Sequence, residues 1–179
     1  MRKVIRKCFL AWQFDQEEKW LNEMAAKGLG LVAIGFCRYE FEQCTPGEYQ
    51  YRIELLEHKP THPESMQYIK FVEDTGAEQI GSYMRWVYFR KKTDNGSFDL
   101  FSDNTSRIRH LGRIIALLVA VNIFNICVGC YNVFLAIAWD SAANYCGFAN
   151  LAIGALIFKG IFKLWRRRKQ LKKEQQIFE

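Results

Sequence analysis

The sequence predicts an α+β domain followed by a hairpin of two transmembrane helices. Strand-like and helix-like segments alternate through the first hundred residues, and the same order of segments occurs twice. Residues 114–139 then run for 26 positions without a charged side chain, which exceeds the roughly 20 residues that a helix needs to cross a bilayer. A second apolar stretch follows almost at once, so both outer ends of the hairpin should lie on one side of the membrane.

The residues at their ends predict two helices in the first domain. Asp15–Glu18 and Thr61–Glu64 each place a capping side chain three residues before a glutamate. Gly28 and Gly76 follow the apolar stripes of these helices. A glycine at this position usually takes the left-handed conformation that ends a helix, so we expect a positive φ angle at both.

Strand patterns surround each helix. The segments are continuously apolar or alternate apolar and polar residues, and they lie at residues 8–14, 31–36, 38–42, 49–55, 79–83 and 85–89. The order β-α-β-β is thus repeated with a period of about 45 residues. This order predicts a two-layer sandwich in which both helices cover one face of a shared antiparallel sheet. A ferredoxin-like arrangement of the same elements is the alternative.

The aromatic residues of the two repeats have two interpretations. A domain of this size needs most of its large side chains for its core, and this interpretation is favoured. The alternative is a ligand-binding groove between the two halves. The candidate groove residues are Trp12, Tyr39, Tyr51, Trp86 and Tyr88.

The second membrane span is short. Residues 142–158 supply 17 positions without a charge, and the span reaches Trp165 if Lys159 and Lys163 extend their ammonium groups to the headgroups. Asp140-Ser141 forms the link between the spans. The predicted organisation is a cytoplasmic domain at 1–100, a juxtamembrane segment at 101–113, the hairpin at 114–165 and a basic cytoplasmic tail at 166–179.

The distribution of charge predicts the orientation and the partners. Residues 1–106 carry a net charge of −2, and residues 107–179 carry +8. Basic residues flank both outer ends of the hairpin and remain on the cytoplasmic side of a membrane, so the domain and the tail are expected in the cytoplasm at the cell membrane. These residues attract anionic lipid headgroups by about 1 kcal/mol each. The basic pI of about 9.0 therefore does not indicate binding to nucleic acid.

Small and polar residues form one stripe along each predicted span. Small residues let membrane helices approach closely, and asparagines hydrogen-bond across the contact, so the stripes are interpreted as a packing seam. A polar pathway is the alternative, and it would require an oligomer or a partner protein. The seam residues are Asn122, Asn125, Gly129, Asn132, Gly147, Asn150 and Gly154.

The position of the link determines which seam residues should face each other. A turn at Asp140-Ser141 places Asn132 against Asn150. Asn125 would then lie opposite Ile157 and Phe158. Because an unpaired amide in hydrocarbon is costly, we expect Asn122 and Asn125 to face a second copy of the chain or another membrane protein.

Motifs for catalysis or metal binding are sparse. Glu57, His58, His62 and Glu64 cluster before the second helix, but two prolines interrupt the spacing expected of a zinc motif. They are interpreted as solvated loop residues. No phosphate-binding loop and no set of nucleophile, base and oxyanion donor is recognisable, so neither an enzyme nor a cofactor is predicted.

The remaining polar residues of the first domain have structural interpretations. Cys8, Cys37 and Cys44 are expected to be reduced thiols, because the domain is predicted to lie in the cytoplasm. Glu17 and Glu18 are interpreted as favourable charges near a helix N-terminus.

The sequence resembles a bacterial family catalogued as domain of unknown function 2812. Residues 9–28 read Phe-x-x-Trp-Gln-x-Asp-x-Glu-Glu-Lys-Trp-Leu-x-Glu-Met-Ala-x-Lys-Gly, and Trp86-x-Tyr88-Phe89 and Leu100-Phe-Ser-Asp103 extend the likeness. It covers roughly residues 5–115 and implies a domain followed by two membrane spans, with a regulatory role. The duplicated β-α-β-β unit is also similar in topology to small-molecule-binding regulator domains.

The expected function is therefore non-enzymatic. The sequence favours a two-pass membrane protein whose cytoplasmic domain is a regulatory, sensory or accessory interaction module. The alternative is a small-molecule sensor that binds its ligand in an aromatic groove between the two halves.

Overall fold

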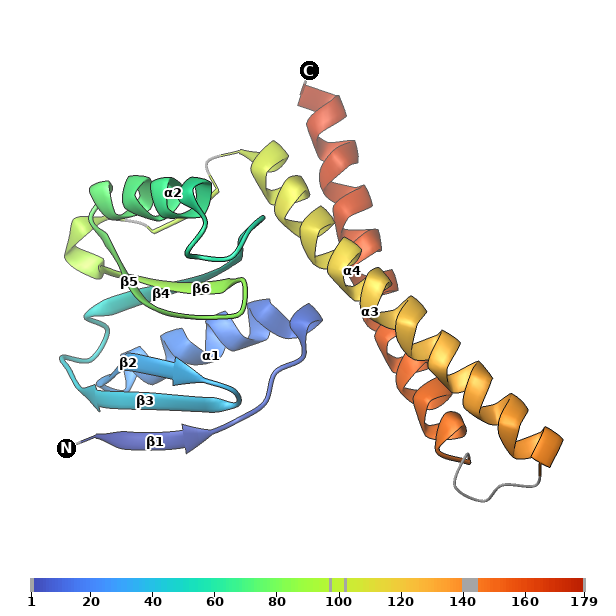
Figure 1. The fold of residues 1–179 in the computed structure, drawn as a ribbon. Coiled ribbons are helices and arrows are strands. Elements are labelled where there is room, and N and C mark those ends of the chain that lie inside the picture. Colours follow the sequence, from blue (N-terminus) through green and yellow to red (C-terminus); the bar gives the residue numbers. More distant parts are fainter. Residues whose placement is uncertain (1, 97, 102, 140–144, 179) are drawn as a thin grey trace. The chain divides into compact units, whose positions relative to one another are not determined.

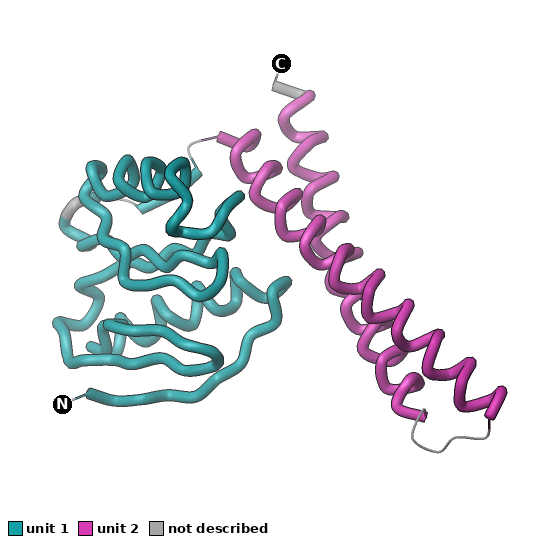
Figure 2. Tube along the Cα trace, viewed as in Figure 1, with its two compact units in different colours: residues 1–102 teal, residues 103–179 magenta. Residues whose placement is uncertain are grey.

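The computed structural model describes residues 2–96, 98–101, 103–139 and 145–178. The chain forms two compact units, residues 1–102 and residues 103–179 (Figure 2). The first unit contains β1 (Lys3–Arg6), η1 (Ala11–Gln13), α1 (Phe14–Ala26), β2 (Leu29–Gly35), β3 (Arg38–Gln43), β4 (Tyr49–Leu55), α2 (Pro63–Asp74), β5 (Ala77–Tyr83), β6 (Trp86–Lys92) and η2 (Thr93–Asn95) (Figure 1). The second contains α3 (Asn104–Trp139) and α4 (Cys146–Phe178).

The first unit has the predicted α+β class and contains two antiparallel sheets. Sheet A has the strand order β1-β3-β2, and sheet B has the order β4-β6-β5. One shared sheet was expected, and this detail is corrected. The expected strand at residues 8–14 is also wrong, because the strand is Lys3–Arg6 and residues 11–13 form η1.

Side-chain hydrogen bonds explain why the strands do not join into one sheet. The edge strands β2 and β5 lie side by side, but each contains a bulge, between Leu31 and Ala33 and between Gln79 and Gly81. At the first bulge the backbone N–H of Leu31 donates to the Tyr51 hydroxyl at 2.7 Å. The carbonyl of Leu31 accepts from the guanidinium of Arg90 at 3.2 Å. Side chains of the second half therefore occupy backbone groups that a continuous sheet would use.

The two helices lie on opposite faces of sheet B. Tyr88 packs with the α1 residues Leu21 and Met24, whereas its neighbour Phe89 packs with Ile69 and Val72 of α2. Successive strand residues point to opposite faces, so α1 lies between the sheets and α2 on the outer face of sheet B (Figure 1). The predicted sandwich with both helices on one face is corrected in this respect.

The internal repeat is visible in the backbone. Gly28 and Gly76 have φ angles of 77° and 85° at the ends of α1 and α2, which confirms their predicted role. The tight turn between β2 and β3 places Cys37 at a φ angle of 51°, and the turn between β5 and β6 places Met84 at 56°. The predicted capping side chains are not used, because α1 begins at Phe14 and neither helix has a side-chain cap.

The second unit consists of two long apolar helices that pack along each other. Both are long and apolar enough to cross a membrane. A Cβ atom added to Gly147 would lie 2.7 Å from the carbonyl oxygen of Gly129 and 2.9 Å from Cβ of Asn132. Gly147 therefore permits a backbone contact that no larger residue allows, as expected for a membrane-type seam.

The pairing within this seam differs from the expected one. The side-chain N–H of Asn125 donates to the carbonyl of Asn150 at 2.7 Å, and Gly154 lies beside the side chains of Asn122 and Asn125. Both asparagines thus face α4, and the expectation that Asn125 lies opposite Ile157 and Phe158 is wrong. The register was calculated from a turn at Asp140-Ser141, which lies outside the described residues.

We predict that Gly28→Ala destabilises the domain more than Gly47→Ala. Both glycines have φ angles near 77°, so each substitution should cost about 1–2 kcal/mol of backbone strain. At Gly28 the added Cβ would also lie 3.0 Å from the carbonyl oxygen of Cys44, whereas at Gly47 it would meet no atom within 4 Å. Urea unfolding of the full chain in detergent, followed by tryptophan fluorescence, measures the difference. Equal losses in the two variants would contradict it.

Candidate functional site

A pocket of about 170 Å³ lies between the two halves of the first unit, at the N-terminal end of α1. Both repeats contribute the same kind of element to it. The β2–β3 turn supplies Phe36 and Cys37, and the β5–β6 region supplies Tyr83 and Met84. The pocket therefore depends on the association of the two halves.

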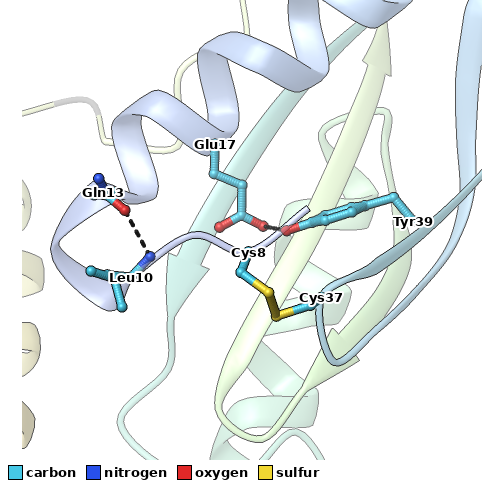
Figure 3. The surroundings of a disulfide bond; sticks show 6 residues. All are labelled: Cys8, Leu10, Gln13, Glu17, Cys37 and Tyr39. Carbon is cyan, nitrogen blue, oxygen red and sulfur yellow. Dashed lines mark hydrogen bonds between the residues drawn. A yellow bond between two sulfur atoms is a disulfide. The ribbon is translucent and has the colours of Figure 1, made fainter. Parts of the chain in front are cut away.

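A buried carboxylate lies on the inner wall of this pocket. Glu17 is only 7% exposed, and its Oε1 accepts hydrogen bonds from the hydroxyls of Tyr39 at 2.6 Å and Tyr88 at 2.5 Å. Figure 3 shows the Glu17–Tyr39 bond, with the second oxygen of Glu17 directed away from that hydroxyl. One tyrosine comes from each repeat, so Glu17 joins the two sheets through a single oxygen atom.

The environment alters the acidity of all three groups. Burial raises the pKa of Glu17, and the hydrogen bonds from Tyr39 and Tyr88 oppose this effect. Burial and the neighbouring carboxyl raise the pKa of both tyrosines. The two hydroxyls therefore remain protonated donors near neutral pH. Among the described residues that line the pocket, none is Lys, Arg or His.

Apolar side chains form the rest of the wall and the rim. Phe14 and Trp86 lie with their ring centroids 6.1 Å apart. At the rim, Phe36 is 77% exposed and packs its ring 5.9 Å from that of Tyr83, while Met84 is 74% exposed. Exposed apolar residues that surround a cavity are typical of a binding site.

A disulfide between Cys8 and Cys37 lies beside the carboxylate (Figure 3). The expectation that both cysteines are reduced thiols is corrected by this bond. The β1 strand pairs with β3, and the N–H of Lys7 donates to the carbonyl of Cys37 at 3.1 Å. This pairing brings the two Cα atoms to 4.6 Å. The bond fastens the segment before η1 to the β2–β3 turn, and both border the pocket.

A second hollow of about 390 Å³ lies on the outside of α1 and shares Phe9 with the first. The ammonium of Lys7 lies over the rings of Phe9 and Trp20, 4.8 and 4.7 Å from their centroids. None of its lining residues is buried. This hollow is larger but lacks a buried polar group, so the pocket at Glu17 is the better candidate.

Three of the five predicted groove residues line the pocket, namely Tyr39, Trp86 and Tyr88. Trp12 lies in η1 but does not line it. Tyr51 is fully buried in the core, where its hydroxyl accepts the Leu31 N–H.

Glu17 was interpreted only as a favourable helix charge, so its role was missed. Helical spacing contained the signal, because Glu17 falls on the same face as Phe14, Leu21 and Met24. A carboxylate within an apolar stripe is unusual and requires an explanation.

Three residues of the predicted loop cluster come together on the surface. The possible ligand atoms of His58, His62 and Glu64 lie within 4.8 Å of one another, and all three residues are exposed. The imidazole rings stack at 4.2 Å. A closed zinc site has four protein ligands, whereas this group has three exposed residues at the start of α2 and agrees equally with the solvated residues that were predicted.

We predict that the free energy of unfolding of the first unit falls as the pH rises from about 4.5 towards 7. Burial raises the pKa of Glu18 to about 7, and the pKa of Glu17 is raised by the same cause. Because each folded pKa exceeds the unfolded value of 4.5, the folded state binds more protons in this window. Stability must then decrease with pH, by at most about 1.4 kcal/mol per pH unit for one carboxyl.

The variants Glu17→Gln and Glu17→Gln/Glu18→Gln test this dependence. The first should flatten the pH profile in part, and the double variant should flatten it further. Urea unfolding of the full chain in detergent at a series of pH values measures the profile. A double variant with the full wild-type slope would show that other groups are responsible.

Comparisons with known proteins identify the family. A search of curated proteins and a search of solved structures each gave no match. A family model described as protein of unknown function DUF2812 matches residues 13–123, which is more than half of the chain and includes Glu17, Tyr39 and Tyr88. The chain therefore belongs to the DUF2812 family.

Proposed function

We propose that this protein is a membrane-anchored, non-enzymatic sensor whose N-terminal domain binds a small molecule in the pocket at Glu17. The observation that carries the proposal is the pocket itself, which both repeats build and which contains one buried carboxylate. A ligand that contacts both halves would stabilise their association, because binding to the folded state alone increases stability. This is the alternative expected from the sequence, and the geometry favours it over a simple interaction module.

The pocket chemistry supports binding rather than catalysis. Tyr39 and Tyr88 both donate to Glu17, so their hydroxyls are already engaged. Cys37 is joined to Cys8 and offers no thiol. Catalysis by these residues would need a nucleophile within reach of a base, and the described lining residues present instead a fixed acceptor among aromatic rings.

The surface of the hairpin supports a location in the bilayer. In the central part of the hairpin, the contact face contains the buried residues Asn122, Gly129, Gly147 and Gly154, whereas many large apolar residues point outward. The outward residues include Phe124, Phe134, Ile137, Phe148, Leu156 and Phe158. This distribution is the reverse of a water-soluble protein and matches a helix pair surrounded by lipid.

Aromatic residues mark two levels on α4 that fit the thickness of a bilayer. Tyr145 precedes the helix and Trp165 lies within it, and both side chains are exposed. The two residues are twenty positions apart, which corresponds to a rise of about 30 Å in a helix, the usual thickness of the hydrocarbon core. Tyrosine and tryptophan are enriched at the two interfaces. Arg166 and Lys169 follow Trp165, as expected on the cytoplasmic side.

We predict that reporters fused before Met1 and after Glu179 are cytoplasmic and that a reporter inserted at Ser141 is external. The basic residues around the hairpin are the reason. A cytoplasmic Ser141 reporter would contradict the two-span orientation. The structure joins Cys8 to Cys37, whereas a cytoplasmic domain faces a reducing compartment. Thiol trapping in intact cells therefore tests the orientation independently, and a trapped disulfide would support an oxidising side for the domain.

We predict that some single-ring compounds raise the midpoint of thermal unfolding of the full chain in detergent. The panel contains 2-phenylethylammonium, 2-phenylethanol and phenylacetate, which share a ring and differ in charge. Ala11 lines the pocket with a single methyl group, so Ala11→Trp should fill the space and abolish the increase.

Ala26→Trp is the matched control. Ala26 is exposed at the other end of the same helix and does not line the pocket, so this variant should respond as the wild type does. If no compound of any charge stabilises the wild type, or if Ala11→Trp responds fully, the proposed function is wrong.

A further inference from the structure

We propose that the pocket is selective for a small organic cation, a ring-bearing ammonium whose charged group contacts Glu17. This inference rests on the proposed function and specifies the class of ligand. It concerns the charge and the size of the molecule rather than the existence of binding.

The charge follows from the condition of Glu17 in the structure. Its carboxylate is buried among aromatic residues, and the described residues give it two tyrosine hydroxyls and no cation. Both hydroxyls donate to Oε1, so Oε2 keeps its capacity to accept. Taking a carboxylate out of water without a cation is costly. An ammonium group placed at Oε2 would offset part of that cost, whereas an anion would be repelled.

The aromatic wall favours the same class of ligand. Tyr39 and Tyr88 lie beside the carboxylate, and Phe14 and Trp86 line the pocket near them. The face of an aromatic ring attracts a cation, more strongly when water is excluded. The pocket therefore combines a carboxylate with several aromatic rings. A neutral molecule of the same shape would retain the ring contacts but lose both electrostatic attractions.

The volume limits the ligand to about one ring with a short chain. A cavity of about 150 Å³ accommodates benzene, and this pocket measures about 170 Å³. An ammonium on a two-carbon chain attached to one ring is close to this size. The apolar rim at Phe36, Tyr83 and Met84 provides contacts for the ring once the charged end has entered.

Calorimetric titration of the full chain in detergent tests the inference, with 2-phenylethylammonium and 2-phenylethanol as probes of matched shape. We expect the ammonium to bind at least about tenfold more tightly than the alcohol, because only the ammonium gains the ion pair with Glu17 and the attraction of the aromatic rings. Glu17→Gln should remove most of this preference. It keeps the shape of the side chain and an oxygen that can accept from both tyrosines.

Glu23→Gln is the control, because Glu23 lines the other hollow on the same helix. This variant should keep the full preference for the ammonium. A preference lost in Glu23→Gln and kept in Glu17→Gln would assign the cation to the other hollow and overturn the inference.

The pH dependence of the wild type gives a second measurement that needs no variant. The pKa of Glu17 is raised by burial, so acidification should protonate its carboxylate. The affinity for the ammonium should then fall, whereas the affinity for the alcohol should not change. Equal affinity for the two probes, or an ammonium affinity that is unchanged in Glu17→Gln, would overturn the inference and leave the proposed function standing. Failure of every probe to bind the wild type would instead reject the proposed function and the inference together.

Discussion

The first unit depends on the hydrogen bonds that the side chain of Asn22 makes with the open edge of β4. Asn22 of α1 accepts a hydrogen bond from the N–H of Tyr51 at 2.8 Å and donates to the carbonyl of the same residue at 3.1 Å. One turn earlier, Glu18 accepts from the N–H of Ile53 at 3.1 Å. These three bonds occupy the outer edge of β4, where unpaired backbone groups would otherwise be exposed. They also hold α1 between the two sheets.

The position of α1 determines the rest of the core and the pocket. With the polar positions of α1 committed to β4, its apolar residues Leu21 and Met24 fill the space between the sheets. Glu17 lies on this inner face, one position before Glu18, and therefore reaches the tyrosines of both repeats. The pocket is the space between the first turn of α1 and the turns that join β2 to β3 and β5 to β6. A buried carboxylate is an unfavourable element in a core, and its presence is understandable if it serves recognition.

The two units differ in the kinds of residue that they bury and expose. The first unit buries large aromatic and aliphatic side chains, as a domain in water must. The central part of the hairpin buries Asn122, Gly129, Gly147 and Gly154 and exposes phenylalanines such as Phe124 and Phe134, a pattern that suits two helices long and apolar enough to cross a membrane. Asn125 illustrates the consequence, since its amide is bonded to the Asn150 carbonyl within the hairpin. The expected second copy is therefore not needed to satisfy that group.

The sequence by itself determined most of the elements and the glycine endings of both helices, although it misplaced the first strand and the helix caps. The repeated order, the apolar runs and the two terminal glycines are local features, because they depend on hydrophobic periodicity and on the φ angles that glycine alone adopts easily. Tertiary structure alone decided which strand edges meet, that α1 lies between two sheets, and which oxygen of Glu17 is shared by Tyr39 and Tyr88. These are contacts between residues 22 and 71 positions apart. Their geometry depends on the bulges at Leu31 and Gln79 and on the path of the intervening chain, and no local pattern encodes either.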